Sequence, residues 1–120
     1  MAWSTSDLFE SKDVDSRVPV TELESRQLRL SKELRKAGYD GALIHNPIDL
    51  YYFCGGRQDS TMFIPAEGSE ATSIQYVRRS LSRAKFEAGD DDSIHEVVKF
   101  PRLSELSNDL KSRGVNRLPS

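Results

Sequence analysis

Apolar and polar positions along the chain recur with two different periods, and these periods predict helices and strands in turn. Between Val20 and Ala37, leucines return every three to four residues among charged side chains, which predicts an amphipathic helix. Thr21 and Glu24 have the spacing of a capping box, and Gly38 is a typical left-handed helix end. The stripe expected to face a sheet consists of Leu23, Leu30, Leu34 and Ala37, with Gln27 filling a gap.

Shorter apolar runs between turn residues predict the remaining elements. Asn46 and Pro47 have the types expected at the cap and first position of a helix. Val77 would then join the buried stripe of a later helix that Gly89 ends. In chain order, the predicted elements are a buried strand at 41–45, a short helix at 47–53, a hairpin of 61–65 with 70–76, a helix at 78–88, a strand at 94–100, a helix from 103 to 114, and a pattern at 115–118 that would allow one more strand. Helices alternating with strands indicate an α/β fold.

The composition is that of one globular domain. The 120 residues suffice for one hydrophobic core, and 37% of them are apolar and 30% charged. The net charge of −2 does not favour nucleic acid as a partner. No apolar run approaches the roughly 20 residues of a membrane span, and the N-terminus lacks the pattern of a secretory signal. We therefore expect no membrane partner. Because the chain has one cysteine, Cys54, we expect no internal disulfide and a cytoplasmic location.

Few side chains offer hydrolytic chemistry. A two-metal centre needs several carboxylates and usually a histidine, whereas His45 and His95 are far apart and in no metal-binding pattern. We expect His45 to be either a structural residue or part of a ligand cleft, because ligands of open α/β sheets sit beyond the carboxyl ends of strands. We expect His95 on the surface of a strand. Asp90–Asp92 is typical of a solvated turn.

Two further features have an ordinary structural interpretation. Cys54 has no neighbouring base in the sequence, so we expect a partly buried small hydrophobe rather than a nucleophile. The predicted helix at 78–88 carries a basic patch that would suit a phosphate or an acidic partner. Patches without interleaved aromatic residues are usually solvated helix faces. The patch consists of Arg78, Arg79, Arg83 and Lys85.

Three stretches together are more specific than any single element. Residues 26–44 are a helix followed by Gly-Tyr-Asp-Gly-Ala-Leu-Ile, and residues 46–55 run from Asn-Pro to Tyr-Tyr-Phe-Cys-Gly. Residues 94–100, Ile-His-Glu-Val-Val-Lys-Phe, precede the leucine-spaced helix that ends at Gly114. In this order and spacing, the stretches resemble the N-terminal domain of the creatinase and Xaa-Pro peptidase family, the "pita-bread" metallopeptidases.

The resemblance implies a fold and a division of labour. Family members have a mixed α/β domain, related to the ribonuclease-H architecture, ahead of a larger catalytic domain. For this chain, the resemblance implies a mixed sheet of about five to six strands flanked by helices over residues 18–120, after a flexible arm over 1–17. The family's catalytic domain holds two divalent metal ions between two Asp, one His and two Glu, and the creatinase branch works without metal. This chain ends before such a domain, so we expect no catalytic residue, metal ligand or cofactor in it.

The resemblance also singles out a loop. Residues 51–59 contain three aromatic residues, two glycines, a guanidinium and a carboxylate, and an arginine there can offer a planar fork to a carboxylate. In the family this loop often points at the active site of the neighbouring subunit. Arg57 is therefore the first candidate for substrate binding, with Gln58, Asp59 and His45 as lesser ones. Gly56 stands where the family often has an aromatic residue, and a purely structural loop is the alternative.

Three functions compete. The leading expectation is a non-catalytic N-terminal domain of a Xaa-Pro dipeptidase, aminopeptidase or creatinase-like hydrolase, which helps dimerisation and substrate access. Its partners would be a catalytic domain and a second copy of the chain. The alternative is a stand-alone module that binds a small ligand or a protein through the Arg57 loop. An enzyme complete within this chain is disfavoured, because the sequence shows no nucleophile with its base and no metal cluster.

Overall fold

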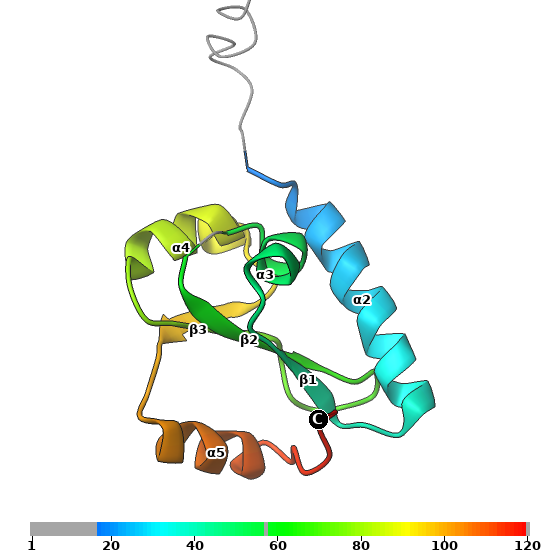
Figure 1. Cartoon of the computed structure of the whole chain (residues 1–120). Helices are drawn as coiled ribbons and strands as arrows, with labels where there is room; N and C mark the ends of the chain where they lie inside the picture. Colours follow the sequence, from blue (N-terminus) through cyan, green and yellow to red (C-terminus); the bar gives the residue numbers. More distant parts are fainter. Residues whose placement is uncertain (1–16, 57, 120) are drawn as a thin grey trace, which may run out of the picture.

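A four-stranded mixed sheet forms the centre of the computed structural model, which describes residues 17–56 and 58–119 (Figure 1). The predicted arm, apart from Arg17, and the candidate Arg57 therefore lie outside the described residues. β1–β2 and β2–β3 pair antiparallel and β3–β4 pair parallel, so β1, β3 and β4 share one direction. In spatial order, the strands are β1 (Gly41–Ile44), β2 (Ser60–Pro65), β3 (Ile74–Val77) and β4 (Glu96–Lys99).

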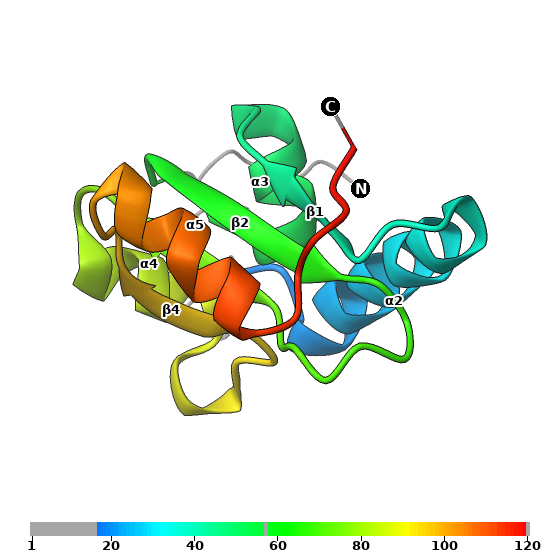
Figure 2. The same ribbon diagram turned by 90° about the horizontal axis from the view of Figure 1, so that it is seen from below.

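Helices cover both faces of this sheet. Three of them lie on one face, and the fourth lies alone on the opposite face, as the view from below also shows (Figures 1 and 2). A short 3₁₀ turn, η1 (Asp90–Asp92), follows the third helix. The helices of the first face are α2 (Val20–Ala37), α3 (Pro47–Cys54) and α4 (Leu81–Ala88), and α5 (Leu103–Ser112) covers the other.

The central strand β2 connects the two layers, because its side chains alternate between them. Met62 and Ile64 pack toward α3, in a cluster with Leu50. Phe63 points the other way and packs with residues of α5. Gly41 of β1 lies against the Phe63 ring, so closely that a Cβ at this position would collide with it. The two faces of β2 therefore set the positions of the helices on both sides.

Helix α2 spans Val20–Ala37, as the leucine pattern predicts, and Gly38 ends it with φ +82°. Leu23, Gln27 and Leu34 are buried and Leu30 is partly buried, which confirms most of the predicted inner face. The prediction is wrong for Ala37, which is exposed at the end of the helix. The predicted capping box is wrong, because Pro19 occupies the N-cap and no side chain caps the helix.

Helix α3 also begins as predicted. Pro47 takes its first position, and the Asn46 side chain accepts a hydrogen bond of 2.8 Å from the Ile48 backbone N–H. Gly55 then ends the helix in the left-handed conformation.

The segment around β3 differs from the prediction. The strand begins at Ile74 rather than at residue 70, so a longer loop joins it to β2. Val77 pairs with Ser60 in the sheet and does not belong to the next helix. Helix α4 starts at Leu81, after Ser80 with φ 59°. The strand register therefore extends the sheet into the segment where the apolar spacing suggested a helix.

The sheet in the described residues has four strands, whereas five to six were predicted. Residues 115–118 lie near the start of β1 but form no strand. The Asp40 N–H donates to the Arg117 carbonyl (2.7 Å), and the Asp40 carboxylate accepts the backbone N–H groups of Asn116 and Arg117 at 2.8 and 2.7 Å. The Asp40 side chain thus accepts backbone N–H groups that would otherwise be available to pair with a neighbouring strand.

We predict that Leu34→Asp lowers the free energy of unfolding by about 3 kcal/mol or more, because it places an unpaired charge against the sheet. Leu34 is 6% exposed, whereas Leu28 on the outer face of the same helix is 47% exposed. Urea unfolding of both variants makes the comparison, with Leu28→Asp as the matched control. Equal stability of the two variants would show that the assigned inner face is wrong.

Candidate functional site

The candidate site lies at the sheet edge where β1, β3 and β4 end. His45 directly follows β1, Arg78 directly follows β3, and Asp59 directly precedes β2. The antiparallel register brings the last two together, since the Arg78 N–H donates to the Asp59 carbonyl at 2.9 Å. Side chains from three separate segments therefore meet at one edge.

A threonine of β2 joins these side chains. The Arg78 guanidinium donates to Thr61 Oγ1 at 3.2 Å and lies 3.4 Å from the Asp59 carboxylate. The same Thr61 Oγ1 is 3.2 Å from Nδ1 of His45. The guanidinium also stacks on Phe100, with its carbon 4.1 Å from the ring centroid. Arg78 is thus held in place while its side chain remains 40% exposed, an arrangement suited to binding an anion rather than to bond cleavage.

Gln58 points away from this group. Its Nε2 donates to Glu87 of α4 at 2.9 Å, and its carbonyl accepts the Ser60 hydroxyl at 3.0 Å. Among the predicted substrate-binding residues, the structure thus brings Asp59 and His45 to one cluster, Asp59 through Arg78 and His45 through Thr61, which Arg78 also contacts. Gln58 turns toward the helix layer.

The predicted basic patch is divided. Arg78 and Arg79 precede α4, because the helix begins at Leu81, and Arg78 turns to the sheet edge. Arg83 lies within α4, 3.8 Å from Glu87. The four basic residues therefore do not share one helix.

A chain of hydrogen bonds between buried side chains runs beneath the site. Gln27 of α2 donates from Nε2 to the Phe53 carbonyl (2.8 Å), and the same Nε2 is 3.4 Å from His95 Nδ1. His95 Nε2 is 3.3 Å from Oε1 of Gln75, whose Nε2 donates to Ser60 Oγ at 3.1 Å. We name this set, Gln27, His95, Gln75 and Ser60, the buried amide–imidazole chain.

The donors and acceptors of the buried amide–imidazole chain fit only one protonation state of His95. Gln27 offers an N–H to Nδ1, so Nδ1 must accept, and Gln75 offers a carbonyl oxygen to Nε2, so Nε2 must donate. A second proton would sit on Nδ1 and face another donor. The buried amide–imidazole chain therefore requires neutral His95 with its proton on Nε2.

The prediction that His95 lies on the surface is wrong, because the residue is 5% exposed. It precedes β4, and its side chain turns inward to the amides of Gln27 and Gln75. Burial lowers the pKa of His95 from 6.5 to about 4. The ring is therefore uncharged at neutral pH.

Other candidate groups have structural surroundings. Cys54 is fully buried, and burial raises the pKa of its thiol to about 11, so the thiol stays protonated at neutral pH. Asp90–Asp92 forms the exposed turn η1, which confirms the solvated turn. Within residues 17–56 and 58–119, no three His, Cys, Asp or Glu side chains gather as metal ligands would. None of the helices in these residues combines the length and apolarity that crossing a bilayer requires.

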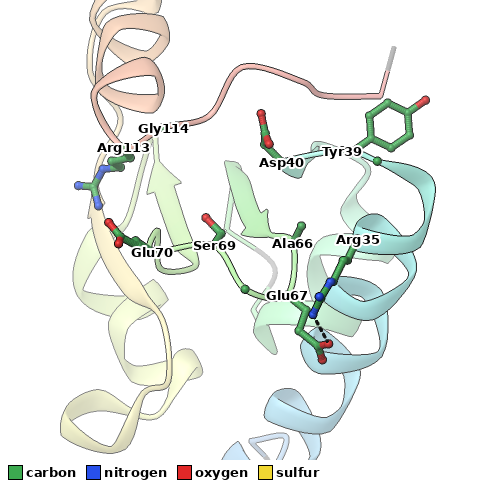
Figure 3. A pocket seen from close by; sticks show the side chains of 11 residues that line it. Arg35, Tyr39, Asp40, Ala66, Glu67, Ser69, Glu70, Arg113 and Gly114 are labelled. Atoms are coloured by element: carbon green, nitrogen blue, oxygen red, sulfur yellow. Dashed lines mark hydrogen bonds and ion pairs between the residues drawn. The ribbon is translucent and has the colours of Figure 1, made fainter.

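A polar pocket of about 480 Å³ lies at the opposite edge of the sheet (Figure 3). Its wall includes Arg35, which is 3.4 Å from the Glu67 carboxylate, and Asp40, which holds the backbone of residues 116–117. These backbone hydrogen bonds keep the pKa of Asp40 below its usual value. These three side chains already bind protein groups, so this pocket is a weaker candidate for a ligand.

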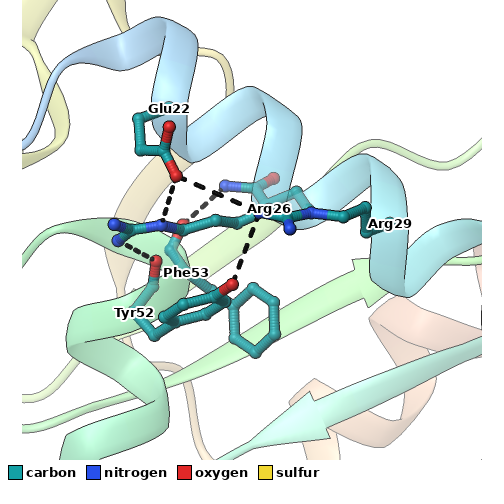
Figure 4. A network of polar contacts seen from close by, with 6 residues as sticks. Glu22, Arg26, Arg29, Tyr52 and Phe53 are labelled. Carbon is teal, nitrogen blue, oxygen red and sulfur yellow. Dashed lines mark hydrogen bonds and ion pairs between the residues drawn. The ribbon is translucent and has the colours of Figure 1, made fainter.

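A cluster on the outer surface fastens α3 to α2 (Figure 4). Arg26 donates to the Tyr52 carbonyl at 2.9 Å, and its guanidinium carbon lies 4.4 Å from the centroid of the Tyr52 ring. Glu22 accepts from Arg26 at 3.1 Å and lies 4.0 Å from Arg29. The contacts fix α3, which ends at Gly55.

Sequence reasoning missed Thr61, Arg78 and the buried amide–imidazole chain as site-forming features. Two signals were present. Gln27 interrupts an otherwise apolar stripe, and Gln75 stands within the apolar run of β3. Because buried amides need partners, these positions indicate a polar network inside the core.

The comparisons with known proteins agree with this architecture. The model of the creatinase/prolidase N-terminal domain matches residues 26–118. The chain belongs to the creatinase/prolidase N-terminal domain family. The match covers the helix α2 from Arg26, all four strands and α5.

A solved structure shares the fold of this creatinase/prolidase N-terminal domain. It is the crystal structure of the aminopeptidase P, Xaa-Pro aminopeptidase, from Streptococcus thermophilus, with a TM-score of 0.55 and 17% sequence identity. The alignment covers 80% of this chain and 71% of that chain. A search of curated protein sequences found no match. At this identity the similarity shows the fold, which confirms the mixed α/β domain.

We predict that this creatinase/prolidase N-terminal domain loses stability as the pH falls from about 6.5 to 4. In that range the unfolded protein binds a proton at His95 and the folded protein does not. The contribution of neutral His95 to the free energy of unfolding is therefore fully present above pH 6.5 and declines below it. The shift corresponds to roughly 3 kcal/mol. Urea unfolding at several pH values measures the decline.

The variant His95→Gln should remove this part of the pH dependence, although it is less stable than wild type at pH 7. His45→Gln is the matched control, because His45 is exposed, and it should retain the wild-type slope. A wild-type slope in His95→Gln would contradict the neutral, buried imidazole.

Proposed function

We propose that the chain acts as the non-catalytic N-terminal domain of a Xaa-Pro dipeptidase, aminopeptidase or creatinase-like hydrolase, where it helps dimerisation and substrate access. The observation that carries the proposal is the family match over residues 26–118. The fold shared with a protein described as a Xaa-Pro aminopeptidase supports it.

The chemistry of the described residues supports a binding role over a catalytic one. The sheet edge offers a fixed guanidinium at Arg78, a carboxylate at Asp59 and an imidazole at His45. Its hydroxyl, on Thr61, is buried and already bonded to two of these side chains. Such a group can hold a charged ligand but presents no accessible nucleophile beside a base. We therefore assign the bond-breaking step, with any divalent metal ions, to a catalytic domain of the parent protein in the cytoplasm.

Substrate access is assigned to the loop that enters β2. Asp59 and His45 lie at the same sheet edge, and Gln58 is anchored to Glu87 of α4. Arg57 is their neighbour in the sequence and would add a second guanidinium. We propose that these four residues contact the substrate of a neighbouring subunit in a homodimer.

We predict that the purified chain, supplied with Mn²⁺ or Co²⁺, does not hydrolyse Xaa-Pro dipeptides or tripeptides. A bona fide Xaa-Pro aminopeptidase assayed in the same buffer is the positive control. Sequencing the transcript past the codon for Ser120 completes the test. The proposal requires an open frame that encodes two Asp, one His and two Glu in a catalytic domain. Turnover by the chain itself, or a stop codon at that point, would contradict it.

A second candidate function, a stand-alone module for small carboxylates, is favoured by the exposed Arg78 guanidinium at the sheet edge. It predicts that calorimetry detects binding of acetate or glycine to the isolated chain, and that Arg57→Ala and Arg78→Ala each weaken this binding at least tenfold. Arg79→Ala is the control for charge, since Arg79 is exposed and outside the cluster. Absent binding, or binding that stays at the wild-type level in either variant, would exclude this function.

A further inference from the structure

The sheet is open along one lateral side, that of its outermost strand β4. β4 is the last strand in the spatial order, so its outer side pairs with no strand among the described residues. Glu96 and Phe100 donate their N–H groups inward, to Ser73 and Val77. Because alternate residues of a strand direct their backbone groups to opposite sides, Val97 and Lys99 direct theirs outward. An extended segment can pair with such an edge.

A groove runs beside this open edge. It has a volume of about 560 Å³ and lies between β4 and α5. Val98 of β4 forms an apolar part of its wall and is 37% exposed, and Tyr76 of β3 also lines it. Glu105 and Asp109 of α5 contribute the opposite wall. Open backbone groups next to a groove between a strand and a helix are the elements of peptide recognition by strand addition.

The helix wall carries negative charge with unused acceptor capacity. Asp109 accepts hydrogen bonds from the Tyr76 hydroxyl at 2.8 Å and from Nε of Arg113 at 3.1 Å. Both bonds end on Oδ2, so Oδ1 is available as far as the described residues are concerned. In the described part of the chain, Glu105 Oε2 accepts one bond, of 3.4 Å, from the Arg102 N–H. Like charges four residues apart on a helix repel one another. A cation between them would relieve that repulsion.

The one lysine of the wall does not supply this cation. Lys99 lines the groove, but in the described part of the chain no ion pair joins it to Glu105 or Asp109. Arg113 serves Asp109 on the oxygen already used, and it also lies 3.7 Å from Glu96. Among residues 17–56 and 58–119, no side chain therefore places a positive charge between the two carboxylates.

We propose that the groove between β4 and α5 binds an extended peptide segment that carries a Lys or Arg side chain. The segment adds to the outer edge of β4 through the backbone groups of Val97 and Lys99. Alternate side chains enter the groove, one apolar side chain against Val98 and one cation against Glu105 and Asp109. The partner is thus a basic, extended segment of another protein, and the assignment does not rest on the proposed function.

The probe for this site is a blocked nine-residue peptide of alternating valine and threonine with one central lysine. Amide NMR of the isotope-labelled chain should show saturable shifts at Val97, Lys99 and the α5 residues around Glu105 and Asp109. A peptide with central glutamate should bind at least tenfold more weakly. Equal binding of the two peptides, no binding at millimolar concentration, or shifts confined to other surfaces would overturn the proposal.

Two variants separate charge from backbone pairing. Glu105→Lys should weaken binding of the lysine peptide at least tenfold, and Glu24→Lys on α2 is the matched control, because Glu24 is exposed and far from the groove in the sequence. Val97→Pro removes an outward N–H without removing a bond to β3, and should also weaken binding. Unchanged affinity in Glu105→Lys would overturn the proposal even if Val97→Pro fails to fold.

A second copy of the chain is the competing occupant of this edge. Dilution of the free protein distinguishes it, because self-pairing moves the Val97 and Lys99 amide signals with protein concentration and without peptide. Signals that stay constant on dilution and move with the lysine peptide support the proposal, whereas signals that move on dilution and not with peptide contradict it.

Discussion

The buried amide–imidazole chain is the constraint on which the rest of the structure depends. Gln27, His95, Gln75 and Ser60 come from four separate segments, and each is nearly inaccessible to water. A satisfied hydrogen bond contributes about 1 kcal/mol, whereas an orphaned buried group costs about 1 to 3 kcal/mol. Each of the four side chains has its partners only when the other segments are in place. The buried amide–imidazole chain therefore links α2, β2, β3 and the entry to β4 into one arrangement.

The buried amide–imidazole chain also contacts Gln58, one of the residues proposed to bind a substrate. Ser60 accepts from Gln75 and donates to the Gln58 carbonyl, and Gln58 is in turn held by Glu87 of α4. Gln58 and the start of β2 are thereby fixed from the core outward, while the Arg78 guanidinium stays at the surface. Under the proposed function, this fixed position of Gln58 is what would hold the neighbouring substrate-binding residues in place.

The sequence predicted those elements whose local and tertiary preferences agree. The leucine spacing located α2 to the residue, and Asn46 with Pro47 located α3, because caps and amphipathic faces are local signals. The order and spacing of three stretches identified the family. The start of α4 was missed because Val77 suits a helix stripe as well as a strand, and pairing with Ser60 decided it. His95 was missed because its burial depends on Gln27 and Gln75, which are distant in sequence, and nothing local indicated that they would meet. Of the site, His45 and Asp59 were expected, whereas Thr61 and Arg78 needed the register of β2 with β3.

The most direct test of this account is the ¹⁵N NMR spectrum of the His95 imidazole between pH 8 and pH 4. The buried amide–imidazole chain requires a neutral ring with its proton on Nε2, so Nε2 should show the shift of a protonated nitrogen and Nδ1 that of a bare acceptor, with little change until the pH approaches 4. A ring that is protonated on Nδ1, or that titrates near pH 6.5 while the domain stays folded, would contradict the account.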